Sequence, residues 1–504
     1  MAAQTDTKVN LQIERTAAME PLGWHSGDPH LHIPRQSARD DEVVLDLLEA
    51  EDIRYGSILG YNEPAGPYSG FMEKLASPQQ RGLGKKSARD RDGYHAFSGQ
   101  EYRNTTYGHI LLFNRDDLVF KGQDLNADNW PVYGLVARET MDQGGYAAYA
   151  HGGYRQEVYA DVALGALNAI ELLQFGIYRE IGLTDWYHML NAGYRIPCVG
   201  ASDWPACRWM GDCRTYVYHE GATDFPQWLQ AMAEGRSFMT TGPLLLLAVD
   251  GHRPGDTIAL EGAGPHTVKV EIQLNCEVTS VDEIDIIVGG EVVKKIHFSS
   301  KDGFEPGWRK FEETLELPRS TWIAARAFSK TPGGQPDAEA HTNPVYVDLD
   351  GRRVYQPDSL DTWVERIDGQ TAKHRQRNFP EKARVLDYFQ KARDLLLEIR
   401  AEKGLKSNDD PAKRSAPVFE AARVSGLEVD AAEAFPSEEA LREFLKPVAP
   451  KTPTEALATF ETLPGFEMQL VAAEPLVYDP VAAAFDEDGN LYVCEMRDYP
   501  FKPG

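Results

Sequence analysis

Trp24-His25-Ser26-Gly27-Asp28-Pro29-His30-Leu31-His32 is the stretch that decides what fold and site to expect from this chain. Side chains alternate between the two faces of a strand, so His30 and His32 point the same way if the stretch is extended. Two neutral imidazoles side by side form half of a transition-metal site. The pair alone is equally consistent with two polar strand residues that happen to alternate, so the rest of the chain has to decide.

Further metal-binding residue types recur along the chain, each at or near the end of a short apolar run that has the pattern of a strand. These residues are Glu101, His109, His151, Glu171 and Asp203. Several of the runs are separated by helix-like segments, and a β/α barrel gathers the ends of its strands at one rim. The series therefore favours a metal site over an accidental histidine pair.

Three of these residues are candidate ligands with a specific role. The carboxylate of Glu101 has two oxygens and can bridge two cations, as two-metal hydrolases require, with His109 at the mouth of the adjoining strand. His151 follows the apolar run Tyr146–Ala150 directly. The alternatives are a solvated turn for Glu101 and His109, and a helix-cap or core histidine for His151.

Asp203 ends the run Val199-Gly200-Ala201-Ser202 and suits a ligand that also accepts the proton of an activated water. Its alternative role is a helix N-cap. Asp28 is a candidate to orient an imidazole from behind. Glu171 lies inside an apolar run, where a carboxylate costs energy unless it is paired, so it either supports the ligands or forms a salt bridge.

Arg35, Arg208 and Arg214 are candidates to hold an anionic substrate or an oxyanion. Each is equally consistent with an ordinary surface charge.

From residue 22 to 245 the chain alternates between strand-like and helix-like segments. Strands are predicted at Trp24–Ile33, Tyr55–Gly60, Ala96–Glu101, His109–Phe113, Tyr146–Ala150, Ala169–Gln174 and Ile196–Ala201. Helices are predicted at Asp40–Ile53, Pro131–Gln143, 157–167, Asp185–Ala192 and Phe225–Ala233, the last capped by Asp224, and a polar loop at 77–93. This alternation favours parallel β/α units, and so an α/β fold, over an all-α or all-β class.

The pattern changes after residue 245. Short runs joined by Gly or Asp turns predict a β-sandwich at 246–355, with strands at Val268–Leu274, Ile284–Val288, Glu291–His297, Thr314–Leu317 and Trp322–Phe328. A helical segment (356–405) follows, with one apolar stripe at Val385, Phe389, Ala392, Leu396 and Ile399, and then a linker rich in Pro, Ala and charge (406–455). A strand–turn–strand pattern at Val481–Val493 predicts a hairpin, expected to open a larger β domain (456–504), and residues 1–21 form an N-terminal extension.

Composition limits the class of protein and its partners. A length of 504 residues suggests about three domains, and 42% hydrophobic with 26% charged residues is typical of a soluble globular protein. The net charge of -26 argues against nucleic acid or an anionic membrane as partner. No apolar stretch reaches the length of a transmembrane span, and the first twenty residues lack a signal-peptide core. The localisation expected is cytoplasmic, unless a preceding segment directs export to the periplasm or beyond.

The five cysteines are Cys198, Cys207, Cys213, Cys276 and Cys494. Their odd number and the absence of a C-x-x-C spacing argue against a disulfide framework. A Cys207–Cys213 bridge is compatible with an oxidising compartment and is left open.

These motifs resemble those of the PHP metallohydrolases, above all the CehA/McbA branch named for carbaryl hydrolases. The resemblance covers about 22 to 350 and rests on Gly27–His32, Gly99–Glu101 with His109, Ala150-His151, Ser202-Asp203, Phe238–Pro243, Val249–Gly255 and His341–Tyr346. It implies a distorted PHP-type (β/α)7 barrel followed by a β-sandwich. It also implies one cation among His30, His32, Glu101 and Asp203, and a second among Glu101, His109 and His151.

Two departures from the family pattern stand out. The Asp-His-Asn that usually ends the second strand is replaced by Gly60-Tyr61-Asn62, and the late Asp-x-His is here Asp203-Trp204-Pro205. In the family those histidines serve a third metal. The resemblance therefore implies two divalent ions, zinc or manganese with iron as a further candidate, and puts three-metal activity in doubt.

The stretch from Leu463 to Arg497 resembles the start of propeller-type membrane-associated dehydrogenases of planctomycete-like bacteria. The match covers about forty residues and carries no quinone or haem site, so no activity is expected of it. Because such neighbours usually belong to exported proteins, it weakens the expectation of a cytoplasmic protein.

The function expected is metal-dependent hydrolysis of a small-molecule phosphoester, or of a carboxyl or carbamate ester, by a metal-activated water. Asp203 would accept the proton of that water, and Glu101 would bridge the cations. The alternative is a non-catalytic barrel that serves as a binding or scaffold module for a glycan or a partner domain.

Overall fold

The computed structural model of the chain divides into two compact units, Met1–Val424 and Ser425–Gly504, and each is described by itself. The structure describes residues 15, 17–33, 35–61, 82–104, 106–119, 129–151, 157–174, 182–205, 208–221, 223–262, 264–276, 281–298, 307–329, 338–406, 451–460, 462, 467–486 and 489–495.

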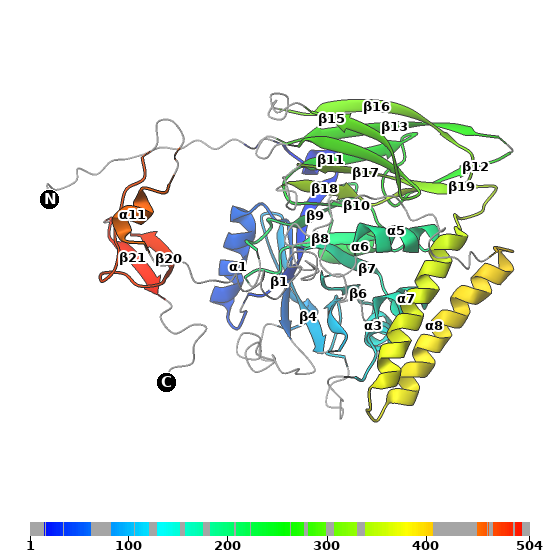
Figure 1. The fold of residues 1–504 in the computed structure, drawn as a ribbon, viewed down its shortest axis with the longest axis horizontal. Coiled ribbons are helices and arrows are strands. Elements are labelled where there is room, and N and C mark those ends of the chain that lie inside the picture. Colours follow the sequence, from blue (N-terminus) through cyan, green and yellow to red (C-terminus); the bar gives the residue numbers. More distant parts are fainter. Residues whose placement is uncertain are drawn as a thin grey trace. The chain divides into compact units, whose positions relative to one another are not determined.

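The first unit is built on one large mixed sheet that curls around itself (Figure 1). Its site-bearing part runs in the order β1-β2-β4-β5-β6-β7-β8. The strands are β1 (Trp24–Leu31), β2 (Tyr55–Tyr61), β4 (Tyr94–Asn104), β5 (Gly108–Phe113), β6 (Tyr146–Tyr149), β7 (Ala169–Gln174) and β8 (Cys198–Ala201). The end of β8 returns to β1, because Leu31 and Trp204 form a parallel bridge. The carboxyl ends of the parallel strands therefore share one edge of the sheet, and β5 begins at that edge.

The expectation of parallel units holds for β1-β2-β4 and for β6-β7-β8, but it is wrong for β5. This strand runs antiparallel to both β4 and β6. The reason is the short connection from Asn104 to Gly108, which suits a hairpin and leaves no room for a crossover helix. The expected polar loop at 77–93 is also corrected in its described part, because β3 (Gly84–Arg91) pairs antiparallel with β4. Residues 77–81 lie outside the described residues.

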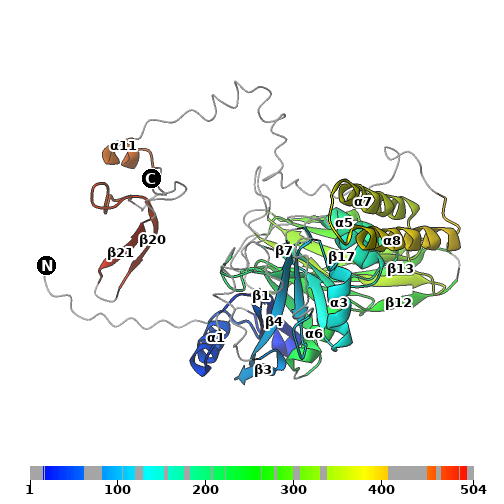
Figure 2. The same ribbon diagram turned by 90° about the horizontal axis from the view of Figure 1, so that it is seen from below.

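Helices of the first unit cover the curled sheet and bury an apolar face against it (Figures 1 and 2). They are α1 (Ala38–Ala50), α3 (Tyr133–Asp142), α4 (Val158–Ala163), α5 (Leu183–Asn191) and α6 (Phe225–Ala233), close to their predicted bounds. The predicted cap of α6 is confirmed: Asp224 accepts a hydrogen bond from Gln227 N at 2.8 Å, and Gln227 bonds back to Asp224 N. This reciprocal pair of hydrogen bonds, a capping box, satisfies otherwise unpaired amides at the helix start.

Part of the region predicted as a β-sandwich continues the large sheet. Strand β10 (Ser237–Thr240) pairs with β9 (Arg214–Tyr218) on one side and with β18 (Glu339–Thr342) on the other. Beyond β18 follow β17 (Thr321–Phe328), β19 (Val345–Leu349) and β12 (Thr257–Leu260). Strand β14 (Glu283–Val288) also pairs with β17, and β15 (Glu291–His297) pairs with β14.

The second layer of this region is a three-stranded sheet. It consists of β11 (Leu244–Val249), β13 (His266–Asn275) and β16 (Arg309–Leu317). Leu247 of β11 and Val270 of β13 share one buried cluster with Ile286 of β14 and Ala325 of β17. Two sheets thus share a common apolar core in this region, which we call the sandwich.

A pair of long helices, α7 (Pro357–Gln376) and α8 (Lys382–Glu402), completes the first unit (Figure 2). The apolar stripe expected on α8 is buried: Val385, Phe389, Ala392 and Leu396 belong to the same core as the helices α3, α4 and α5. Trp363 of α7 donates a hydrogen bond to Tyr159 O at 3.0 Å. The helical pair is therefore an integral part of the first unit.

The second unit contains α11 (Pro453–Leu457) and the hairpin of β20 (Pro480–Phe485) and β21 (Leu491–Glu495). The predicted hairpin is confirmed, with Phe485 opposite Leu491 next to the turn. Leu476, Phe485 and Tyr492 are exposed. Most of the predicted linker, 407–450, lies outside the described residues. No helix among the described residues combines the length and the apolar character needed to cross a bilayer.

The burial of α8 leads to a stability prediction. Phe389 is fully buried between α8 and the core of the first unit, whereas Lys391, two positions on, is exposed. Replacing a buried Phe by Ala removes transfer energy and leaves a cavity, so Phe389→Ala should lower the free energy of unfolding by about 3–5 kcal/mol. Urea unfolding of the full chain measures this, with Lys391→Ala as the matched control that should change little. A variant Phe389→Ala as stable as its control would contradict the packing described.

Candidate metal centre

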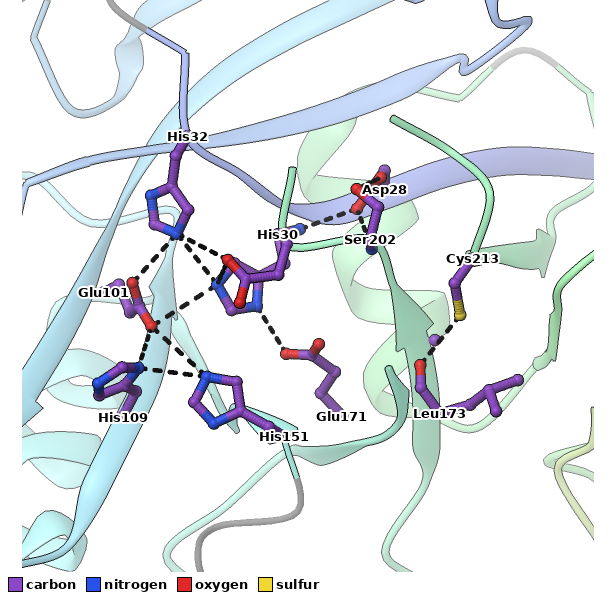
Figure 3. A network of polar contacts seen from close by, with 12 residues as sticks. Asp28, His30, His32, Glu101, His109, His151, Glu171, Leu173, Ser202 and Cys213 are labelled. Atoms are coloured by element: carbon purple, nitrogen blue, oxygen red, sulfur yellow. Dashed lines mark hydrogen bonds and ion pairs between the residues drawn. The ribbon is translucent and has the colours of Figure 1, made fainter. Parts of the chain in front are cut away.

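One edge of the curled sheet brings the predicted ligands together, toward the carboxyl ends of β1, β4, β6 and β8 and at the start of the antiparallel β5 (Figure 3). His30 and His32 come from the end of β1, Glu101 from β4 and His109 from β5; His151 follows β6 and Asp203 follows β8. His151 and Asp203 both have left-handed backbone conformations, with φ of 42° and 52°. Residues other than glycine adopt this region at a cost of about 1–2 kcal/mol, and such strain concentrates at functional sites.

Four of these residues form a first cluster, which we call site A: His30, His32, Glu101 and Asp203. The Nε2 atoms of His30 and His32 are 3.2 Å apart, which confirms that the two rings share one face. Asp203 Oδ1 lies 3.2 Å from each of these nitrogens. Glu101 adds Oε2 at 3.2 Å from His32 Nε2 and Oε1 at 3.6 Å from His30 Nε2.

These separations are those expected of ligands around one tetrahedral ion. Ligands that each lie about 2.0–2.2 Å from zinc are about 3.3–3.6 Å from one another. His30, His32 and Glu101 offer donor atoms that all lie within 4.8 Å of one another. The donor set therefore fits a divalent transition metal.

A second cluster, site B, consists of Glu101, His109 and His151. His109 Nδ1 lies 3.2 Å from His151 Nε2 and 2.7 Å from Glu101 Oε1, and His151 Nε2 lies 3.9 Å from the same oxygen. Three protein ligands leave one position of a tetrahedral ion for water or substrate. Site B therefore has the composition of an open site.

Glu101 belongs to both sites. Its side chain is fully buried, and its Oε1 accepts no hydrogen bond although it lies close to His30, His109 and His151. An unsatisfied buried carboxylate oxygen is costly. A cation within reach of Oε1 would supply the missing partner, so the surroundings of Glu101 fit a metal-bridging role.

The electrostatics of site A show how it behaves without a cation. Burial lowers the pKa of His30, but the carboxylates of Asp203 and Glu171 outweigh it and raise that pKa well above its usual value. The pKa of Asp203 shifts the opposite way: burial raises it, and the neighbouring His30 and His32 bring it far below the usual range. Protonation of the histidines would thus compensate the negative charge of the buried carboxylates. A divalent cation would compensate the same charge.

Site B behaves differently. Burial lowers the pKa of His109, although Glu101 opposes the shift. Burial also lowers the pKa of His151, and repulsion from His109 and His30 takes it well below its usual value. Both imidazoles are therefore held neutral near pH 7, which is the form that binds metals.

Glu171 supports site A from behind. It is fully buried on β7, and its Oε2 lies 2.8 Å from His30 Nδ1. A carboxylate in this position fixes the orientation and the tautomer of an imidazole whose other nitrogen faces a metal. Burial raises the pKa of Glu171, while His30 opposes the shift.

The expectation that Asp28 orients an imidazole needs correction. Its oxygens accept hydrogen bonds from the backbone N of His30 and of Ser202, both at 3.2 Å, from Ser202 Oγ at 2.5 Å and from Gly211 N at 3.0 Å. Asp28 therefore ties the end of β1 to the segment that carries Asp203. The pairing of β1 with β2 shifts its register between Asp28 and Leu31.

Arg103 is the residue that the sequence analysis missed. It lies two positions after Glu101 on β4, donates from Nε to Glu101 Oε2 at 2.7 Å, and its Nη2 lies 3.5 Å from His32 Nε2. Its side chain is 15% exposed, so the guanidinium reaches site A from the solvent side. The alternation rule that pairs His30 with His32 also places Arg103 on the face of Glu101, and applying it to β4 would have found this residue.

Two of the three arginines proposed for substrate binding are engaged by other parts of the protein, and the role of Arg208 stays a prediction. Arg35 is fully buried and donates to Asp41, to Ser98 Oγ and to Ser87 O, so it holds α1 to the neighbouring strands and is not available to a substrate. Arg214 donates to Gly211 O and Glu51 O, which gives it a structural role. Arg208 is exposed. The error arises because short-range sequence does not show which partner a guanidinium finds.

Cys213 is buried, and its thiol donates to Leu173 O at 3.0 Å. Cys207 lies outside the described residues, so the bridge between them stays an open prediction.

Metal content tests the two sites. Full-length protein equilibrated with zinc and then dialysed should retain about two ions per chain, because the donors form two ligand sets. The double variant His109→Ala/His151→Ala should retain about one, since site A keeps all of its donors. Elemental analysis measures both, with His266→Ala in β13 as the histidine control. Equal metal content in the double variant and the control would refute site B.

Arg103 leads to a second prediction. The guanidinium holds the oxygen of Glu101 that faces site A, so a cation has to displace it. Hydrogen bonds between charged groups are worth about 1.5–3 kcal/mol, so Arg103→Ala should raise the affinity of site A for zinc by about tenfold or more. Competition with a chromophoric chelator measures the affinity. Arg103→Lys, which keeps the charge, should show a smaller gain, and a weaker affinity in Arg103→Ala would contradict this account.

The comparison with protein families gives a match within the second unit. A domain of unknown function, DUF7133, matches residues 452–504. No curated protein matches the chain. Among solved structures, endonuclease Q in complex with a 27-mer duplex substrate is 13% identical with a TM-score of 0.27, and the match covers 42% of this chain and 57% of that one. PsfC from Pseudomonas syringae PB-5123 is 17% identical with a TM-score of 0.29, covering 40% and 85%. Likenesses at this level carry no argument about function.

Proposed function

We propose that the chain is a metal-dependent hydrolase that cleaves a small-molecule phosphoester, or a carboxyl or carbamate ester, with a metal-activated water. The observation that carries this proposal is the buried carboxylate of Glu101, shared by two adjacent ligand sets. Two divalent cations, zinc or manganese in the first place and iron as a further candidate, would lower the pKa of water toward neutrality and polarise the ester group.

The resemblance to the PHP metallohydrolases of the CehA/McbA branch belongs to the same proposal. In this assignment the curled strands β1 to β8 correspond to a distorted (β/α)7 barrel. The support is that the ligands come from strand ends in the order which the resemblance implies. The resemblance of the second unit to the opening of a propeller-type dehydrogenase stays a prediction.

Asp203 is the residue we assign to accept the proton of the attacking water. Its side chain is 10% exposed, whereas Glu101 and Glu171 are fully buried, so it is the carboxylate of site A that solvent reaches. General base catalysis contributes about 10²–10⁴-fold to a rate. His30 and His32 lower the pKa of Asp203 and so keep it ionised, which is the form required of a proton acceptor or a metal ligand.

Arg103 is the cationic side chain we assign to the substrate. Its guanidinium is partly exposed beside Glu101 and approaches site A from outside. A guanidinium that a metal ion displaces from Glu101 would remain close to the bound substrate. It would then stabilise an anionic oxygen of the substrate as charge develops there. Arg103 thus takes the role that the sequence had suggested for Arg35 and Arg214.

The alternative function is a non-catalytic binding or scaffold module. The observation in its favour is the loss of residues that serve a third metal in the family, with Pro205 in place of the late histidine. Bound metal without turnover of any ester would identify this alternative.

A substrate screen tests the proposal. Metal-loaded full-length protein should hydrolyse an aryl phosphate, or an aryl carboxyl or carbamate ester, and a chelator should abolish the activity. Asp203→Asn should lower kcat by about 100-fold or more because it removes the proton acceptor. Asp212→Asn is the matched control, since Asp212 is exposed and outside the cluster, and it should keep its activity. Metal content measured on each variant separates lost catalysis from lost metal.

Two results would contradict the proposal. Activity that survives the chelator would exclude a metal-dependent reaction. Full metal content without turnover of either substrate class would exclude the hydrolase and leave the binding module.

A further inference from the structure

A second concave site lies in the first unit, between the sandwich and the helical pair. We call it the basic pocket. It measures about 670 Å³ and is lined by the β16–β17 turn (Arg319, Ser320), by the end of β19 and the segment leading into α7 (Leu349, 351–357), and by the end of α8 (Lys403, Leu405). Figure 1 shows the start of α7 and the end of α8 at the same end of the helical pair, next to β19. Three segments far apart in the sequence therefore build it.

The charge of the pocket is opposite to that of the protein. Arg319, Arg352, Arg353 and Lys403 line it without any acidic residue, in a chain whose net charge is -26. Like charges that converge in a concave surface repel one another and concentrate a positive potential there. This arrangement suits an anionic ligand.

Few of these cations are neutralised by the protein. Arg352 lies 3.4 Å from Asp350, but both side chains are well exposed, at 79% and 41%, and such a pair contributes little. Arg319, Arg353 and Lys403 form no ion pair with a described residue. The pocket therefore retains a positive charge that an anion could satisfy.

The backbone adds to this potential. The pocket includes Gln356 and Pro357, which begin the 20-residue helix α7, and no side chain caps that end. The dipole at a helix start favours negative charge, and Asp358 in the first turn of α7 already uses part of this effect. The feature supports the charged side chains and does not stand alone.

Tyr355 gives the pocket an apolar surface beside the cations. Its ring is half-buried, packs against the backbone of Gly193, and has Lys403 Nζ 5.1 Å from its centre. Gly193 has φ of 87°, and a Cβ there would come within 2.4 Å of the ring, so the ring is seated by this glycine. A ligand ring next to an anionic group can therefore stack on Tyr355.

The pocket lies away from the metal centre. Gln356 N donates to Asn191 O at 2.8 Å, at the end of α5. That helix leads into the start of β8, whereas Asp203 follows the end of β8. The two sites are therefore at opposite ends of this β/α unit, and the pocket is separate from the chemistry proposed above.

We infer that the basic pocket binds a small ligand that carries a phosphate or sulfate group next to a ring. The inference does not depend on the proposed hydrolase, because none of its residues belongs to site A or site B.

Calorimetric titration of metal-free, full-length protein tests the inference, with inorganic phosphate, phenyl phosphate and phenol as probes. Phenyl phosphate should bind more tightly than inorganic phosphate, and phenol should not bind. Arg352→Ala/Arg353→Ala should weaken phenyl phosphate at least tenfold. Lys373→Ala/Arg375→Ala, which removes the same charge at the other end of α7, is the matched control and should bind like the wild type. Tyr355→Ala should remove the preference for phenyl phosphate over inorganic phosphate.

Three results would overturn the inference that the pocket binds an anion. They are absence of binding to the wild type, unchanged binding in Arg352→Ala/Arg353→Ala, and an equal loss in the Lys373→Ala/Arg375→Ala control, which would indicate a general charge effect. Binding of inorganic phosphate and phenyl phosphate with equal affinity in the wild type would refute the ring-bearing ligand. Circular dichroism of each variant identifies a loss that is due to misfolding.

Discussion

The buried carboxylate of Glu101 is the group on which the rest of the site depends. It lies on β4, in the middle of the curled sheet, with an oxygen directed to each of two histidine clusters. A carboxylate without solvent is unfavourable unless cations surround it. In this structure Arg103 donates to Oε2 of Glu101 while Oε1 is left to the neighbouring imidazoles, and a pair of divalent ions would meet the requirement more fully. The need to neutralise the carboxylate of Glu101 accounts for the basic and metal-binding side chains around it.

The curling of the sheet and the arrangement of the candidate ligands depend on the same contacts. Curling brings the end of β8 back to β1, and Asp28 fixes the junction through the backbone of His30 and Ser202. This places Asp203 against the histidine pair from the opposite side of the cluster. The left-handed conformations of His151 and Asp203 are tolerated because the strands around them are held by pairing and burial. The fold thus stabilises an arrangement that short peptides would not adopt.

Local patterns were sufficient for much of the structure. The cap and bounds of α6, the stripe of α8 and the residues gathered at sites A and B could all be predicted, because each depends on periodicity, on capping or on the ends of strands. The mixed α/β class is also confirmed. The antiparallel course of β5, the edge strand β3 and the partners of Arg35 could not be predicted. These depend on which distant segments pair, and a single sequence with its local pattern carries no information on that.

The continuity of the large sheet has a consequence for dissecting the chain. Strand β10 has β9 on one side and β18 on the other, so the backbone groups on both of its edges are used. A fragment that stops at residue 245 would keep every candidate ligand but leave one edge of β10 without its neighbour. Open strand edges recruit other chains. The sandwich therefore covers a strand edge through which the part up to residue 245 could self-associate. The two parts are best produced as one chain.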